Sequence, residues 1–239
     1  MGEEDCLRIA ATSDIHWPQY QGLFIQSLRQ LRKKPDLFLI AGDLVNRGNA
    51  RGISPIIKKL AEAKLECPVV SCFGNDDYDT IKDTLRTTAG DTIIFLDDEL
   101  AYFTIRGTEV AIIGSRGVLD QPTFWQSRNI QGIREHYTKR VVTLDSLLKK
   151  AKTKTPYTIL LTHYTPTFST LKGETQRSFA QMGSKRVEEL LVKHSLPLAI
   201  HGHAHRGVRK IKVASTQIYN VALPLNRRIV QFKFQLNQF

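Results

Sequence analysis

Residues 37–43 read Leu-Phe-Leu-Ile-Ala-Gly-Asp, an apolar run of strand length that ends in a glycine and an aspartate. A helix-like stretch follows at Ile53–Ala63, and another apolar run follows at Pro68–Phe73. The same order occurs before residue 37, where the strand-like Leu7–Ser13 precedes Leu23–Leu31, whose apolar residues recur at helical spacing. Strands that alternate with helices predict βαβ units and a mixed α/β fold.

The rest of the chain is richer in strands. It contains two more helical stretches, Gln131–Lys152 and Ser184–His194, and an irregular polar segment at residues 116–129. The expected strands are Thr92–Leu96, Leu100–Ile105, Val110–Gly114, Tyr157–Thr162, Leu198–His201, Val208–Val213, Gln217–Val221 and Ile229–Leu236. The sequence has no internal repeat, low-complexity tract or linker, so residues 1–239 are expected to form a single domain.

The composition is that of a globular protein, with 41% hydrophobic and 24% charged residues. No apolar run approaches the ~18 residues that a membrane helix needs, so no membrane partner is expected. The N-terminus, Met-Gly-Glu-Glu-Asp-Cys, lacks the basic start and apolar stretch of a signal peptide, which favours a cytoplasmic protein. The net charge of +11 is spread over short clusters; it suits an anionic substrate and leaves nucleic acid open as a partner.

Polar side chains follow five of the predicted strands, at the carboxyl edge where open α/β sheets place their sites. Asp14 and His16 are two residues apart, so in an extended chain both side chains lie on one side, and His203 and His205 repeat this spacing. Two carboxylates, four imidazoles and one amide are candidate metal ligands: Asp14, His16, Asp43, Asn75, His163, His203 and His205. This set, without a thiolate, suits Mn²⁺, Fe or Zn²⁺. Seven donors suit two ions that share a carboxylate at a separation of about 3.5–4 Å.

The order of these segments resembles that of the calcineurin-like metallophosphoesterases. The resemblance runs from residue 14 to residue 205 and rests on Asp14-x-His16, Gly42-Asp43, Gly74-Asn75, His163 and Gly202-His203-x-His205. Residues 42–48, Gly-Asp-Leu-Val-Asn-Arg-Gly, are also similar to the family's Gly-Asp-x-x-x-Arg-Gly block. The resemblance implies a four-layer α/β/β/α sandwich, in which helices flank two mixed β-sheets.

The resemblance also implies two divalent metal ions, with Mn²⁺ expected first and Fe, Zn²⁺, Ni²⁺ or Mg²⁺ as further candidates. Asp43 would bridge them; the first ion would be held by Asp14, His16, Asp43 and His205, and the second by Asp43, Asn75, His163 and His203. Each ion lowers the pKa of bound water, so a hydroxide between the ions would attack the phosphorus of an ester in line. The implied activity is the hydrolysis of phosphate esters.

The third motif departs from the family pattern. Most members read Gly-Asn-His-Asp or Gly-Asn-His-Glu, and Gly74-Asn75-Asp76-Asp77 places Asp76 where the histidine protonates the leaving alkoxide. An aspartate beside two dications has a lowered pKa and is a poor acid at pH 7. Some small phosphodiesterases of the family also lack this histidine, so the motif favours a phosphodiesterase. Asp76 is one candidate catalytic residue; the other is Arg47, which is either a forked phosphate contact or a surface ion-pair residue.

Three other functions stay open. A phosphomonoesterase or pyrophosphohydrolase would need an acid from elsewhere, and His136 is a candidate. A non-catalytic scaffold would resemble a retromer subunit of similar fold, although every ligand position is filled here. A nuclease suits the basic charge, but the sequence has no recognisable DNA- or RNA-binding module.

The segment 115–140 is the least similar to the family and is a candidate cap over the site. Within it, Trp125 either stacks on an aromatic group of the substrate or fills the local core. The expected partner is a phosphate ester, with nucleotide-like esters among the candidates. The sequence does not indicate an oligomeric state.

Overall fold

Strand β2 (Leu37–Ala41) is buried at all five positions because it is covered on both faces. Leu37 and Leu39 belong to the core between two sheets, whereas Phe38 and Ile40 belong to the core beneath the helices. The computed structural model describes residues 6–236, and this two-sided burial of central strands recurs throughout it.

The first sheet has five strands in the order β11-β1-β2-β3-β4. The pairs from β1 to β4 are parallel, and β11 is antiparallel to β1. Besides β2, the strands are β1 (Cys6–Thr12), β3 (Val69–Cys72), β4 (Ile94–Phe95) and β11 (Val230–Gln235).

The second sheet has six strands in the order β5-β6-β7-β8-β10-β9. The four central strands are parallel, and the two edge strands are antiparallel to their neighbours. The strands are β5 (Glu99–Ile105), β6 (Thr108–Ser115), β7 (Thr158–Thr162), β8 (Leu198–His201), β9 (Lys210–Val213) and β10 (Thr216–Asn220).

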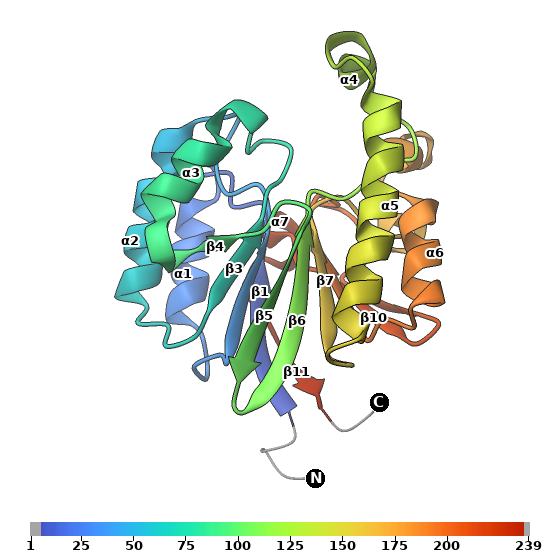
Figure 1. Ribbon diagram of the computed structural model, residues 1–239. Helices are drawn as coiled ribbons and strands as arrows, with labels where there is room; N and C mark the ends of the chain where they lie inside the picture. The colour runs from blue at the N-terminus through green and yellow to red at the C-terminus, as the bar shows by residue number, and fades with distance from the viewer. Residues whose placement is uncertain (1–5, 237–239) are drawn as a thin grey trace.

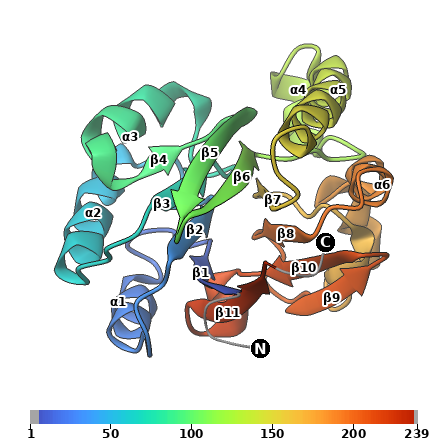
Figure 2. The ribbon, with the colours of Figure 1, turned by 60° about the horizontal axis from the view of Figure 1, so that its bottom comes forward.

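The two sheets pack face to face, and helices cover their outer faces (Figures 1 and 2). The first sheet is covered by α1 (Gln21–Arg29), α2 (Ile53–Glu62) and α3 (Lys82–Ala89), and the second by α5 (Ile133–Lys152) and α6 (Lys185–Lys193). The fold is therefore the four-layer α/β/β/α sandwich that the family resemblance implied. The shorter helices are α4 (Phe124–Asn129) and α7 (Leu223–Asn226), with 3₁₀ turns at Ala50–Gly52, Asp79–Ile81, Gly90–Thr92, Phe168–Leu171 and Gln176–Gln181.

Helices α3 and α4 differ from the sequence prediction, and the four-residue α7 was not predicted either. Helix α3 was not predicted, because its three threonines have low helix propensity and only Leu85 and Ala89 are buried. Residues 116–129 were expected to be irregular, yet α4 ends that segment. A reciprocal capping box between Thr123 and Gln126 begins α4, which has no buried residue and hence no apolar periodicity.

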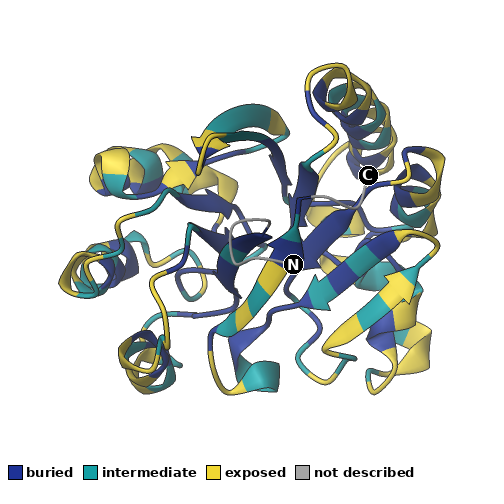
Figure 3. Cartoon of the chain, turned by 90° about the horizontal axis from the view of Figure 1, so that it is seen from below, coloured by how far each residue is buried: buried dark blue, intermediate teal, exposed yellow. Residues whose placement is uncertain are grey.

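Buried residues concentrate in the two sheets, and exposed residues lie on the outer sides of the helices (Figure 3). Within residues 6–236, no helix combines the length and apolar character needed to span a membrane. The predicted cytoplasmic location rested partly on residues 1–5, which lie outside the described residues, and it stays a prediction.

Candidate metal centre

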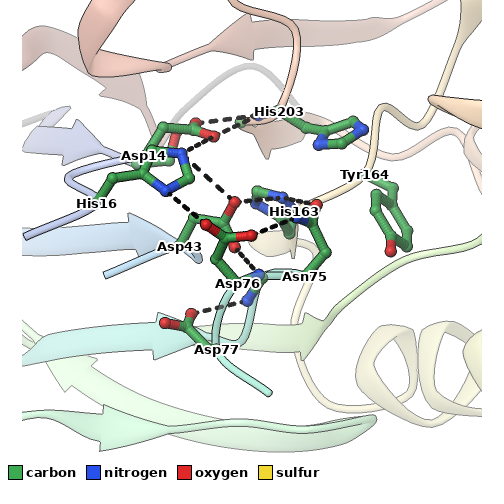
Figure 4. A network of polar contacts seen from close by, with 12 residues as sticks. Asp14, His16, Asp43, Asn75, Asp76, Asp77, His163, Tyr164 and His203 are labelled. Carbon is green, nitrogen blue, oxygen red and sulfur yellow. Dashed lines mark hydrogen bonds and ion pairs between the residues drawn. The ribbon is translucent and has the colours of Figure 1, made fainter. Parts of the chain in front are cut away.

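The seven predicted donors gather where the carboxyl ends of the two sheets meet, and Figure 4 labels all of them except His205. Each follows the end of one of five strands: β1, β2 and β3 in the first sheet, and β7 and β8 in the second. The residues are Asp14, His16, Asp43, Asn75, His163, His203 and His205. Segments far apart in the sequence thus bring their oxygen and nitrogen donors to one place.

Four of these residues have left-handed backbone. The φ angles of Asp14, His16, Asp43 and His203 are 55°, 42°, 53° and 68°. An extended chain is therefore the wrong reason for the convergence of Asp14 with His16 and of His203 with His205. Left-handed backbone at such residues costs about 1–3 kcal/mol each and persists only where the surrounding structure enforces it. The left-handed backbone in the loops after the strands therefore lowers the stability of the fold.

Two glycines allow the loops to approach one another closely. A Cβ atom at Gly74 would collide with the carboxylate of Asp43, and one at Gly202 would lie 2.6 Å from Asp14 Oδ2. The backbone therefore passes close to a carboxylate at both glycines. Any larger residue at either position would displace a carboxylate of the centre.

Asp14 is fully buried and lies between two imidazoles. Its Oδ1 is 3.0 Å from Nε2 of His205 and 3.7 Å from Nε2 of His16. Its Oδ2 accepts a hydrogen bond from the backbone N–H of His203 at 3.0 Å. Donor atoms of Asp14, His16 and His205 all lie within 4.8 Å of one another, which is close enough to share one ion.

Asp43 lies at the middle of the cluster. Its Oδ2 is 3.6 Å from Nε2 of His16 and 3.3 Å from Nε2 of His163, so imidazoles from the two sheets face one carboxylate. Its Oδ1 accepts the backbone N–H of Asp76 at 2.7 Å, which fixes the orientation of the carboxylate. This is the position that a shared ligand of two ions requires.

His163 is held in one orientation. Its Nδ1 donates to the carbonyl oxygen of Ala41 at 2.9 Å, so Nε2 of the neutral ring carries a lone pair. That lone pair faces Oδ1 of Asn75 at 3.0 Å and the Asp43 carboxylate, with no proton between them. The ring of His203 lies beside that of His163, with 4.9 Å between the ring centres. Lone pairs that face one another in this way fit a bound cation.

The electrostatics of the carboxylates also fit a cation. Burial and the nearby charges of Asp77 and Asp14 raise the pKa of Asp43 well above its ordinary value. Burial opposes the ionisation of Asp14 too, but the contacts with His16 and His205 outweigh it and hold the pKa of Asp14 well below its usual range. A divalent ion would relieve the repulsion at Asp43 and allow it to ionise.

The imidazoles divide into two kinds. Burial lowers the pKa of His16, but contacts with Asp14 and Asp76 outweigh it and raise that pKa to about 10. Burial lowers the pKa of His163 to about 4 and that of His203 to about 3. His163 and His203 are therefore neutral at pH 7 and ready to bind a metal, whereas His16 must release a proton to do so.

The two predicted catalytic residues are neighbours in space. The backbone N–H of Arg47 donates to Oδ2 of Asp76 at 3.1 Å, while the Arg47 side chain is exposed. Asp76 itself is half-buried and faces His16. His136, the candidate alternative acid, is exposed on α5.

Three residues beside the centre had no role in the sequence prediction. The buried carboxylate of Asp77 accepts backbone hydrogen bonds from the loop after β2. Arg116 donates to the carbonyl oxygen of Asp77 at 3.0 Å and pairs with Asp79 at 3.1 Å, which joins the two sheets. The ring of Tyr164 packs 5.0 Å from that of His203 (Figure 4). Asp77 lies within the third motif, but Arg116 and Tyr164 carry no signal beyond their places after β6 and β7.

Comparison with known families agrees with this geometry. The sequence model described as calcineurin-like phosphoesterase matches residues 7–207. The chain belongs to the calcineurin-like phosphoesterase family. Members of the family are metal-dependent phosphoesterases, and the donor clusters described above are the corresponding candidate ligands in this chain. No curated protein sequence matches the chain.

Solved structures similar to this calcineurin-like phosphoesterase share its fold at low sequence identity. Phosphopantetheinyl hydrolase from Mycobacterium tuberculosis has a TM-score of 0.68 at 14% identity, with 95% of this chain and 96% of that chain covered. The protein TT1561 of Thermus thermophilus has a TM-score of 0.56 at 16% identity, with 97% and 100% covered. A 5′-nucleotidase precursor from Thermus thermophilus has a TM-score of 0.58 at 14% identity, with 97% and 54% covered. At such identities the similarity concerns the fold alone.

Proposed function

We propose that this phosphoesterase uses two divalent metal ions, with Mn²⁺ expected first, to hydrolyse phosphodiesters. The observation that carries the two-ion proposal is the position of Asp43, whose Oδ2 lies 3.6 Å from Nε2 of His16 and 3.3 Å from Nε2 of His163. The proposed ligands of the first ion are Asp14, His16, Asp43 and His205. Those of the second are Asp43, Asn75, His163 and His203.

Two ions bound here would supply a nucleophile at neutral pH and neutralise the charge on the phosphoryl oxygens. The protein's part is to hold the donors in place. The hydrogen bond from His163 to Ala41 and the bond from the Asp76 backbone to Asp43 orient two of the proposed ligands before any ion binds. We propose that the exposed guanidinium of Arg47 binds a phosphate oxygen of the substrate.

The preference for diesters rests on Asp76. Its carboxylate accepts hydrogen bonds from the Arg47 backbone and the Asn75 side chain, which favour its ionised form. An ionised carboxylate cannot protonate a leaving alkoxide, so esters with good leaving groups should react best. His136, the other candidate acid, lies exposed on α5, where its ring lies beside that of Tyr137.

The segment 115–140 is proposed as a cap that binds the organic group of the ester. Phe124 and Trp125 are 72% and 64% exposed, so Trp125 does not fill the local core. Gln126 of the same helix donates to the hydroxyl of Tyr164 at 3.3 Å, and Tyr164 packs against His203. Helix α4 extends beyond the carboxyl ends of the second sheet (Figure 1). An aryl or nucleobase group is the substrate feature that such rings would bind.

The protein is proposed to act in the cytoplasm. Residues 1–239 are proposed to form a single domain. Nucleotide-like diesters are the first class to test, because a 5′-nucleotidase precursor is among the structures of similar fold. The test is turnover of bis(4-nitrophenyl) phosphate and of 4-nitrophenyl phosphate by metal-free protein reconstituted with Mn²⁺, Fe²⁺, Zn²⁺, Ni²⁺ or Mg²⁺. The expected result is diester hydrolysis that exceeds monoester hydrolysis. Absence of turnover with every metal would favour a non-catalytic scaffold instead.

A further inference from the structure

The side chain of Asp76 lies beside the ring of His16, close to the carboxylate of Asp43 (Figure 4). Its Oδ2 lies 3.2 Å from Nδ1 of His16. The same oxygen accepts the backbone N–H of Arg47 at 3.1 Å, and Oδ1 accepts the side-chain amide of Asn75 at 3.2 Å. Two hydrogen bonds therefore hold the Asp76 carboxylate in place independently of its contact with the imidazole.

The other ring nitrogen of His16 faces the metal centre. Nε2 lies 3.7 Å from Asp14 Oδ1 and 3.6 Å from Asp43 Oδ2, which is too long for hydrogen bonds. Donor atoms at such separations can each lie about 2.1 Å from one shared ion. The two ring nitrogens thus have different surroundings. Nδ1 lies beside the carboxylate of Asp76, whereas Nε2 faces the space between the carboxylates of Asp14 and Asp43.

We propose that Asp76 is a positioning residue for His16, which it holds in the tautomer with the proton on Nδ1 and a lone pair on Nε2 directed at the first ion. The inference rests on the proposed two-metal function and deepens it. A carboxylate that accepts the second N–H of a metal-bound histidine fixes the ring and makes the ligand more basic, and the loss of such a partner typically weakens metal binding about 10–100-fold.

This role accounts for an aspartate at the position where the family usually has a histidine. The four contacts of the carboxylate are the Arg47 N–H, the Asn75 amide, the His16 ring and solvent at its exposed edge. The Arg47 and Asn75 groups donate, and Nδ1 of His16 lies 3.2 Å away, so the site suits an acceptor and not an acid. Donor atoms of His16, Asp43 and Asp76 also lie within 4.8 Å of one another, so direct coordination of an ion by Asp76 is the competing role.

The test measures zinc binding and the His16 tautomer in the full-length chain. Zn²⁺ is diamagnetic, so ¹⁵N-histidine spectra of the loaded protein report which ring nitrogen of His16 carries a proton. Zinc affinities are measured by competition with a chelating dye. The variants are Asp76→Ala, Asp76→Asn, which keeps an oxygen acceptor, and the control Asp83→Asn, which removes an exposed carboxylate on α3.

The wild-type protein should bind two zinc ions, with His16 protonated at Nδ1 and bound through Nε2. Asp76→Ala should weaken the site that contains His16 about 10–100-fold and the other site less, because Asn75 loses only one hydrogen-bond acceptor. The loss for Asp76→Asn should be smaller. Asp83→Asn should bind like the wild type. The inference is overturned if His16 binds through Nδ1, if Asp76→Ala binds both ions normally, or if Asp76→Asn loses as much as Asp76→Ala. A wild-type chain that binds no zinc would instead overturn the proposed function itself.

Discussion

Oδ1 of Asp77 accepts a hydrogen bond from the backbone N–H of Leu44 at 3.1 Å and so joins the loop after β3 to the loop after β2. The same carboxylate accepts the N–H groups of Val45 at 3.2 Å and Gly74 at 2.9 Å. Burial raises the pKa of Asp77, which these backbone bonds oppose. The loop that carries Asp43 is thereby held against the loop that carries Asn75.

Replacing Asp77 by alanine should lower the free energy of unfolding by about 3 kcal/mol, because three buried N–H groups lose their acceptor and each such loss costs ~1–3 kcal/mol before relaxation. Urea denaturation of the metal-free protein measures the change. The control is Asp83→Ala on the exposed side of α3, for which a change within about 0.5 kcal/mol is expected. Equal stabilities of Asp77→Ala and the control would show that the loops do not depend on this carboxylate.

Asp43→Asn should abolish turnover and leave the fold intact. Burial and the charges of Asp77 and Asp14 raise the pKa of Asp43, so removing its charge relieves repulsion in the metal-free protein. The variant should melt at the wild-type temperature or higher without metal and gain less stability than the wild type when Mn²⁺ is added. Its activity should fall below detection, since a bridging ligand is lost. Turnover that survives would rule out the bridging role.

Much of the site could be predicted because each donor follows a strand-like run. Gly42-Asp43 after Leu37–Ala41 has this form, and so does His163 after the run that ends at Thr162. The tertiary contacts that bring the metal donors together could not be predicted from the sequence. The hydrogen bond from His163 to Ala41 exists only because β7 and β2 belong to different sheets that face one another. The left-handed backbone of Asp14 has the same origin, since tertiary contacts override local preference there.

The fold was predictable to a similar extent. Buried strands such as β2 carry a continuous apolar signal, and the alternation with helices indicated the parallel pairing. Helix α4 carries no such apolar signal, because Phe124 and Trp125 are exposed and the helix depends on the capping box between Thr123 and Gln126. A search for Thr-x-x-Gln as a helix start would have found it.

The proposed cap predicts a defect in substrate binding. Trp125→Ala should raise KM for a bis-aryl diester about 10-fold, because stacking of an aromatic group is worth ~1–3 kcal/mol, and should change KM for a methyl aryl diester less. The control is Val142→Ala, which removes another exposed apolar side chain, from α5. Steady-state kinetics at saturating Mn²⁺ measure KM for both esters in both variants. The cap proposal fails if the tryptophan and valine variants have the same KM for both esters.

A buried histidine outside the proposed ligand set predicts acid sensitivity. His201 is fully buried, its Nδ1 donates to the Gly202 carbonyl at 2.8 Å, and burial lowers its pKa to about 4. Between pH 6.5 and 4 the unfolded chain binds this proton and the folded chain does not, so stability falls as the pH falls through this window. One such group costs about 1.4 kcal/mol per pH unit.

Urea denaturation of metal-free protein at pH 7.0 and 5.0 measures this effect. The wild type should lose stability between these values, and His201→Gln should lose ~2 kcal/mol less, since it removes one of the titrating groups. Within the described residues, the buried His163 and the partly buried His203 have similarly lowered pKa values and should account for the loss that remains. If both proteins lose the same free energy, His201 is not neutral in the folded chain.

The last prediction concerns Asp76 and the choice of ester. An aryl alcohol leaves as a stable anion, whereas a serine or sugar alkoxide needs a proton, and general acid catalysis typically supplies ~10²–10⁴-fold. Asp76→His should therefore raise the ratio of monoesterase to diesterase activity, and the ratio cancels any change in metal occupancy. Asp76→Asn removes the negative charge that repels a dianionic monoester but supplies no acid. The amount by which the activity ratio of Asp76→His exceeds that of Asp76→Asn therefore measures the contribution of general acid catalysis. Both variants are assayed at saturating Mn²⁺ with alkyl and aryl monoesters beside the matching diesters. A ratio for Asp76→His that equals the wild-type value, or that moves towards diesters, would mean that Asp76 does not set the preference.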